Sequence, residues 1–211
     1  MKNILRLGIV AQAEIPKQIE PMIETIVREQ FRKLSNVLGG ENVAVVSNIS
    51  YKIGELACIA AIEEGLNLEL SPLEAQEDYG SSEAEMDRKV HGILARQPRS
   101  FVQDHVHTEP ELIDFCDVII LVFYKDDAGE SKNFRELRDK FFAGGIQGPT
   151  PSRLSIEINA PKKWTMESDA EVYFEYIVPA NGRLDSTSEV EIPEKLIAVW
   201  RHQVSRNIAS C

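Results

Sequence analysis

The first half of the chain alternates short apolar runs with longer amphipathic segments. The run LRLGIVA, Leu5 to Ala11, is too short for a helix and is typical of a buried strand. Apolar residues then recur at steps of three and four from Ile19 to Leu38. This spacing predicts an amphipathic helix with Pro16 and Pro21 near its start and Gly39 at its end.

The same alternation continues as far as Gly145. Strands are expected at 43–48, 66–73 and 117–124, and helices at 54–64, 82–95, 110–115 and 134–142. The last of these strands, DVIILVFY, is apolar on both faces, as a central strand of a parallel sheet is. The order of elements therefore predicts an α/β fold with a Rossmann-like, mostly parallel sheet and helices on both faces.

The pattern changes after residue 151. Apolar residues now alternate with polar ones in two stretches, at Leu154, Ile156 and Ile158 and at Val172, Phe174 and Tyr176. A turn is expected at Asn181-Gly182, and a final helix behind Pro193. We therefore expect two units. Residues 1–151 form a Rossmann-like ligand-binding domain, and residues 152–211 form a β-rich extension that ends in a helix and packs on the core or on a partner.

Composition and charge exclude several classes of function. The 211 residues are 43% apolar and 27% charged, as in an ordinary globular protein, and the formal net charge is −11. A chain this acidic lacks the positive surface that general nucleic-acid binding or binding to an anionic membrane requires. The sequence shows neither a membrane-spanning apolar run nor a secretory signal, so we expect a cytoplasmic location.

The negative charge is concentrated in one stretch. Between Gly54 and Asp87 there are ten acids and no Lys or Arg. This stretch includes the ends of the second and third predicted strands, so we expect a local negative field there.

Cysteine and histidine usage gives no sign of a metal site. Cys58, Cys116 and Cys211 are odd in number and unclustered, which is typical of free thiols. His105 and His107 do not share a face in a strand or a helix, so they do not form a pair of metal ligands.

The loops after the predicted strands are the places to look for a ligand, because open parallel sheets bind ligands beyond the carboxyl ends of their strands. None of these loops contains G-x-G-x-x-G or a P-loop. In the second loop, Asn48, Ser50, Tyr51 and Lys52 precede a helix expected to begin near Gly54. A helix N-terminus flanked by hydroxyls and an ammonium can bind an anion. The same residue types also cap helices and form turns, so a purely structural role stays open.

Three stretches resemble the SLOG superfamily, a Rossmann-like group of nucleotide-binding proteins that includes the cytokinin-activating phosphoribohydrolases and DNA-processing protein A. They are LGIVAQ, VVSNISYKIGELACIAAIEEGLNLELSPLEAQEDY and LIDFCDVIILVFY. The chain departs from the group in two places. It has Ser47 to Ser50 where members usually have a glycine-containing turn, and it has DDAGESKNFRELRDKF where the catalytic branch has G-G-x-G-T-x-x-E.

The resemblance implies that the chain binds or senses a nucleotide or a nucleotide-derived small molecule at the carboxyl edge of the sheet. In this arrangement lysines meet phosphate, Asn48 and Ser50 orient it, and Tyr79 contacts base or sugar. The expected ligand-binding residues are Gln12, Asn48, Ser50, Tyr51, Lys52, Tyr79, Lys125, Ser131 and Lys132. The acidic stretch favours a ligand with one or two phosphates, or one bridged by Mg²⁺. No other cofactor is expected, and we expect a homo-oligomer.

Two alternatives remain. Glu136 falls where the catalytic branch keeps its Glu. The chain is then an enzyme that cleaves or exchanges an N-glycosidic bond, of the nucleotide phosphoribohydrolase or nucleoside deoxyribosyltransferase type, with Glu136 as the catalytic carboxylate. Against this, Glu130, Lys132 and Asn133 replace residues of the glycine loop, and Glu136 can simply pair with a lysine four residues away. The other alternative is a non-catalytic assembly scaffold.

Overall fold

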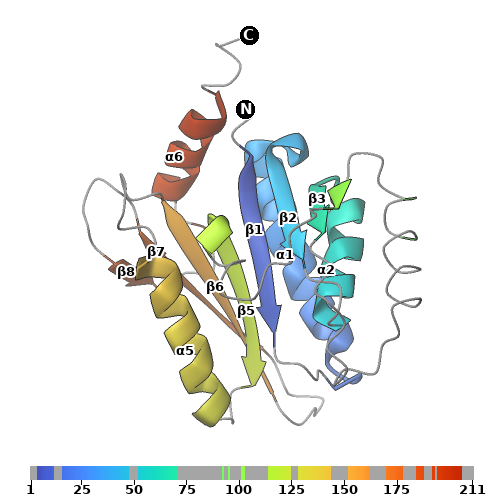
Figure 1. Ribbon diagram of the computed structural model, residues 1–211, viewed down its shortest axis with the longest axis vertical. Coiled ribbons are helices and arrows are strands. Elements are labelled where there is room, and N and C mark those ends of the chain that lie inside the picture. Colours follow the sequence, from blue (N-terminus) through green and yellow to red (C-terminus); the bar gives the residue numbers. More distant parts are fainter. Residues whose placement is uncertain are drawn as a thin grey trace.

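The structure, a computed structural model, describes residues 4–11, 16–47, 52–70, 92, 95, 101–102, 114–124, 128–143, 152–161, 170–177, 184–187, 192 and 194–205. Figure 1 shows how the elements within these ranges are arranged. The strands are β1 (Leu5–Ala11), β2 (Val43–Ser47), β3 (Asn67–Leu70), β4 (Phe101–Val102), β5 (Val118–Tyr124), β6 (Arg153–Ala160), β7 (Glu171–Ile177) and β8 (Leu184–Thr187). The helices are α1 (Glu20–Leu38), the short 3₁₀ helix η1 (Gly40–Asn42), α2 (Lys52–Glu63), α5 (Ala128–Ala143) and α6 (Glu194–Ser205).

The strands form one sheet in the order β4-β3-β2-β1-β5-β6-β7-β8. Neighbours from β4 to β6 are parallel, whereas β7 and β8 are antiparallel additions. The predicted α/β class with a mostly parallel sheet is therefore confirmed. Because β5 pairs with β6 along its whole length, from Val118 opposite Leu154 to Tyr124 opposite Ala160, the sheet is continuous across the predicted boundary at residue 151.

Helices cover both faces of this sheet, as the alternating side chains of β5 show. Val118, Ile120 and Val122 belong to the larger core cluster, which includes buried residues of α1, α2 and α6. Ile119, Leu121 and Phe123 lie in a second cluster with the phenylalanines of α5. In a strand that is buried on both faces, successive side chains point to opposite faces, which is why an unbroken apolar run occupies this central position.

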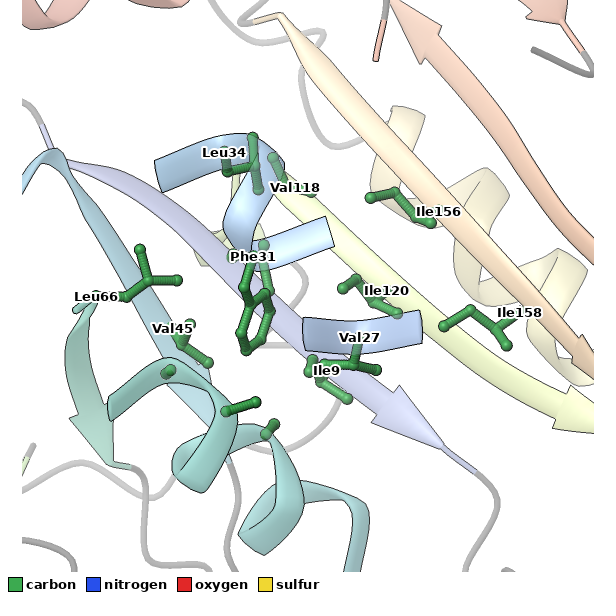
Figure 2. Packing of buried hydrophobic residues seen from close by; sticks show 14 of the residues in the cluster. Ile9, Val27, Phe31, Leu34, Val45, Leu66, Val118, Ile120, Ile156 and Ile158 are labelled. Atoms are coloured by element: carbon green, nitrogen blue, oxygen red, sulfur yellow. The ribbon is translucent and has the colours of Figure 1, made fainter. Parts of the chain in front are cut away.

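The predicted first helix is confirmed, with its buried residues at helical spacing. Val27, Phe31 and Leu34 of α1 face Ile9 of β1 and Ile120 of β5 (Figure 2). The helix stops at Gly39, where φ is +83°, a value that favours glycine. Burying the Phe31 side chain completely contributes about 2 to 3 kcal/mol by removing apolar surface from water.

The predicted last helix is confirmed too, and it covers the end of the sheet formed by β6 and β7. Trp200 is fully buried and shares the larger core with Ile156 of β6 and Phe174 of β7. The Arg201 Nε donates to the Val37 carbonyl at 3.2 Å and so joins α6 to α1.

Some boundaries differ from the sequence-based expectation. The helix expected at 134–142 begins six residues earlier, at Ala128, because its first turns (AGESKN) carry no apolar periodicity for the pattern to detect. The strands β4 and β8 were not expected, and each is short. The turn at 181–182 and most of the helices expected at 82–95 and 110–115 lie outside the described residues. None of the helices in the described part of the chain combines the length and the apolar character needed to cross a membrane.

Candidate functional site

The parallel strands bring their carboxyl ends to one edge of the sheet. Along this edge lie Leu70 of β3, Ser47 of β2, Ala11 of β1, Tyr124 of β5 and Ala160 of β6, and the arrowheads of β1 and β5 point to it in Figure 1. The chain leaves β1 for α1 on one face of the sheet and leaves β5 for α5 on the other. The strand order thus reverses between β1 and β5, which is where open α/β sheets bind ligands.

A buried hydrogen bond joins the first turn of α2 to the end of β2. The Ser47 hydroxyl is buried and donates to the Gly54 carbonyl at 3.1 Å. Cys58 packs beneath this contact, where burial, opposed by the hydrogen bond with Ser47, raises its thiol pKa to about 12. Ser47 and Cys58 therefore hold the helix in place and are not exposed to a ligand.

Lys52 is the first residue of α2, one of the positions predicted to meet phosphate. Its side chain is 45% exposed, and its Nζ lies 3.5 Å from Glu55 Oε2. An exposed pair of this kind contributes roughly 0 to 1 kcal/mol, so a phosphate group can replace Glu55 as the partner of the ammonium at little cost.

The amino end of α5 carries two further predicted ligand residues, Ser131 and Lys132. Lys132 has a side chain 76% exposed, with its Nζ 3.9 Å from Glu136 Oε1. The backbone from Ala128 onward is helical, so Gly129 lies in a helix rather than in a glycine loop. The similarity to the glycine loop of the catalytic branch does not extend to backbone conformation.

Glu136, the predicted catalytic carboxylate, lies two turns into α5. Its side chain is 61% exposed and pairs with Lys132. Eight residues of helix place it roughly 12 Å from the first residue of α5, and so away from the edge where that helix begins. This is the arrangement of a solvated carboxylate on a helix face, the structural alternative considered above.

The remaining predicted ligand residues lie outside the described part of the chain. They are Gln12, Asn48, Ser50, Tyr51, Tyr79 and Lys125. Of the predicted set, the structure therefore places three, Lys52 on α2 and Ser131 and Lys132 on α5. Both helices begin at the carboxyl edge, on opposite faces of the sheet.

The described acids of the acidic stretch are paired with basic side chains, which compensates part of their charge. Four of its ten acids are described, and each one contacts a basic side chain: Glu55 with Lys52, Glu63 with Arg28, Glu64 with Arg32 and Glu69 with Arg6. The first of these pairs lies within the first turn of α2, and the next two join α1 to the carboxyl end of α2. The other six acids are outside the described residues.

The fourth of these pairs belongs to a buried polar cluster at the opposite, amino edge of the sheet. Glu69 is 1% exposed, and its Oε2 lies 3.0 Å from Arg6 Nε. The Asp117 carboxylate accepts the Arg6 backbone N–H at 2.9 Å. Burial, opposed by that hydrogen bond and by the charges of Arg6 and Arg153, raises the pKa of Asp117. The cluster connects β3, β1 and the start of β5. Because it lies at the edge opposite the candidate site, we assign it a role in stability.

Arg153 extends this cluster to β6. Its side chain donates to the Phe141 carbonyl of α5 and lies over the Phe141 ring, with 4.8 Å between the guanidinium carbon and the ring centroid. Burial lowers the pKa of Arg153. The sequence carried a weak signal for it, a basic residue at the start of a strand with one buried face.

A second ion-pair cluster joins α5 to β6 and β7. The Arg138 guanidinium contacts Glu157 at 3.0 Å through Nη1 and Glu175 at 3.1 Å through Nε. Burial, opposed by Arg138 and reinforced by Glu157, raises the pKa of Glu175. Sequence reasoning missed this cluster, because the three residues come from segments that only the fold brings together.

Among the residues that the structure describes, no group of three or more His, Cys, Asp or Glu side chains could hold a metal ion.

A scan of protein-family models, a search of curated proteins and a search of solved structures each found no match to the chain. The similarity to the SLOG superfamily thus remains a resemblance of sequence pattern.

Proposed function

We propose that the chain is a Rossmann-like protein of the SLOG type that binds a nucleotide or nucleotide-derived small molecule at the carboxyl edge of its sheet. The observation that carries the proposal is the strand order, which reverses between β1 and β5 with helices leaving on opposite faces. A ligand placed there lies where loops from both halves of the sheet can contact it.

The described side chains at this edge support an anionic ligand. Lys52 at the start of α2 and Lys132 near the start of α5 are both exposed, and each has a weak pairing with a carboxylate on its own helix. The amino ends of the two helices add the positive ends of their dipoles. One or two phosphates match this modest positive charge better than a longer polyphosphate does.

Calorimetric titration tests the proposal directly. The parent protein is titrated with nucleosides, nucleoside mono- and diphosphates and dinucleotides, each with and without Mg²⁺. The variant Ser50→Ala/Lys52→Ala is compared with Lys140→Ala, which removes an exposed lysine from the last turn of α5, at the opposite edge of the sheet. We expect the double variant to bind phosphate-bearing ligands more weakly and the control to bind as the parent does. Equal binding by all three proteins would refute the site.

The same incubations test the enzymatic alternative. If Glu136 cleaves an N-glycosidic bond, free base accumulates in the parent protein's reaction and not in that of Glu136→Gln. The exposure of Glu136 and its pairing with Lys132 lead us to expect binding without release of base. Sedimentation of the same samples tests the proposed homo-oligomer. Cell fractionation tests the proposed cytoplasmic location.

A further inference from the structure

Helix α5 packs on the sheet along its length, with three phenylalanines and Leu137 in the core cluster that it shares with β5. Three of its contacts with the strands matter for the position of the helix. Toward its amino end Phe134 stacks on Phe123 of β5, with ring centroids 5.3 Å apart. Toward its carboxyl end, Arg153 of β6 donates to the Phe141 carbonyl and lies over the Phe141 ring. Between them, Arg138 reaches β6 and β7. The Phe134 contact is apolar and therefore non-directional, so by itself it tolerates small rotations of the helix.

The Arg138 contact is directional. Its Nη1 lies 3.0 Å from Glu157 Oε1 and its Nε lies 3.1 Å from Glu175 Oε2, so one rigid planar group meets carboxylates on two neighbouring strands. A guanidinium presents its donors in a fixed fork, which a lysine ammonium cannot reproduce. Rotating or tilting the helix would lengthen one of the two contacts, and so the fork fixes the helix in both respects.

The cost of losing these contacts is raised by burial. The side chains of Arg138, Glu157 and Glu175 are only 20%, 13% and 22% exposed. Removing the guanidinium leaves two largely buried carboxylates on adjacent strands, where they repel each other. The helix therefore has one preferred position and orientation on the sheet.

The amino end of this helix is part of the proposed ligand edge. Lys132 lies six residues before Arg138, roughly 9 Å along the helix axis, and the intervening turns are continuous α-helix. A rotation or tilt of α5 at Arg138 thus moves the first turns of the helix as well. It changes the position of the backbone N–H groups and the ammonium that would face phosphate.

We propose that Arg138 is a positioning residue for the ligand edge: through Glu157 and Glu175 it sets where the amino end of α5 meets a phosphate group. The inference rests on the proposed function. It adds that the phosphate part of the ligand, rather than the base or sugar, is the part whose binding depends on Arg138.

The test compares the dissociation constants of a nucleoside monophosphate and of its parent nucleoside. The dissociation constant of the nucleoside divided by that of the monophosphate measures what the phosphate contributes, and this quotient is the ratio meant below. Two variants remove the fork, Arg138→Lys, which keeps the charge, and Arg138→Gln/Glu157→Gln/Glu175→Gln, which removes both largely buried carboxylates with the guanidinium. The third carboxylate near Arg138, that of Asp139, is 70% exposed and stays solvated in this variant. The matched control is Arg32→Gln/Glu64→Gln, which removes an ion pair between α1 and the residue that follows α2. Partial unfolding weakens both ligands by the same factor, so it leaves the ratio unchanged.

We expect the ratio of the two dissociation constants to fall by about twofold to thirtyfold in both fork variants. The control should keep the parent's ratio. An unchanged ratio in both fork variants, with the parent binding nucleotide, would overturn the role of Arg138 and leave the proposed function standing. If the parent binds neither ligand, the proposed function fails and the inference fails with it.

Discussion

The ion pair of the half-buried Arg6 with the buried Glu69 offers the most quantitative test of the fold. The two residues lie on β1 and β3, with Ala44 of β2 opposite Arg6 between them. The proposed perturbation is a double-mutant cycle with Arg6→Met, Glu69→Gln and the combination. Methionine keeps the apolar stem of arginine, and the backbone N–H of residue 6 still donates to Asp117.

The two single changes should differ in cost because the partners differ in exposure. The Glu69 side chain is 1% exposed, whereas that of Arg6 is 34% exposed and lies over the ring of Phe115. Arg6→Met leaves a buried carboxylate without its guanidinium, for which we expect a loss of about 3 kcal/mol in the free energy of unfolding. Glu69→Gln leaves a cation that can turn to water, and we expect a loss of about 1 to 2 kcal/mol.

The double variant buries neither an unpaired acid nor a charge pair. Its loss should therefore fall short of the sum of the single losses by about 1.5 kcal/mol. Urea unfolding followed by far-UV circular dichroism gives the three values, and an unchanged slope against urea confirms that the same surface unfolds in each protein. If Arg6→Met costs less than about 0.5 kcal/mol, or if the single losses simply add, the pair does not hold β1 to β3 as described.

Further predictions concern glycines, a thiol and a carboxyl group. A Cβ at Gly40 would lie 2.4 Å from the Gly65 carbonyl oxygen, so Gly40→Ala should cost about 1 to 3 kcal/mol, and Gly40→Asn at least as much. Gly65 has φ +70° with open space around it, so in urea titrations Gly65→Asn should recover much of the stability that Gly65→Ala loses, since Asn tolerates this conformation. The Cys58 thiol, with its pKa of about 12, should not react with a thiol reagent at about pH 8 in a Cys116→Ala/Cys211→Ser background, where it is the one remaining thiol, until urea unfolds the chain; rapid labelling of the native protein would contradict its burial. Burial raises the pKa of Asp117, so its contribution to stability is fully present below about pH 4, where the unfolded side chain is protonated, and is lost as the pH rises through the higher folded value. Relative to the parent, Asp117→Asn should therefore gain in urea midpoint between about pH 4 and pH 7, and a constant difference would show that the group does not titrate in this way.

Much of the sheet could be predicted because burial on both faces leaves a plain sequence signal. The apolar run of β5 and the helical spacing of Ile23, Val27 and Phe31 in α1 identify their own environments. The pattern was less informative where polar residues are covered by a neighbouring element. Ser155 and Glu157 of β6 alternate with apolar residues, a pattern typical of a strand with one face in water, yet Ser155 is fully buried and Glu157 lies against Arg138.

The polar clusters and the candidate site were harder to predict because their contacts depend on strand order and on where the helices begin. Glu69 counted as one more charge in an acidic stretch, but the order β3-β2-β1 places it beside Arg6, 63 residues earlier in the chain. The start of α5 was missed because a polar first turn has no apolar stripe, and this start decides that Gly129 is helical. The helix after β2 was expected to begin near Gly54 with Lys52 in front of it, and it begins two residues earlier, at Lys52 itself. Its existence could be predicted because the end of an apolar strand followed by a helix is visible in the sequence.

The central claim is that a nucleotide binds where β1 and β5 end and their helices leave on opposite faces. A crystallographic difference map of the full chain soaked with the nucleoside phosphate that binds best in calorimetry tests it most directly. The account predicts ligand density over Ala11 and Tyr124, with a phosphate beside the first turn of α2 or α5. Density at the amino edge, near Arg6 and Arg153, would contradict it.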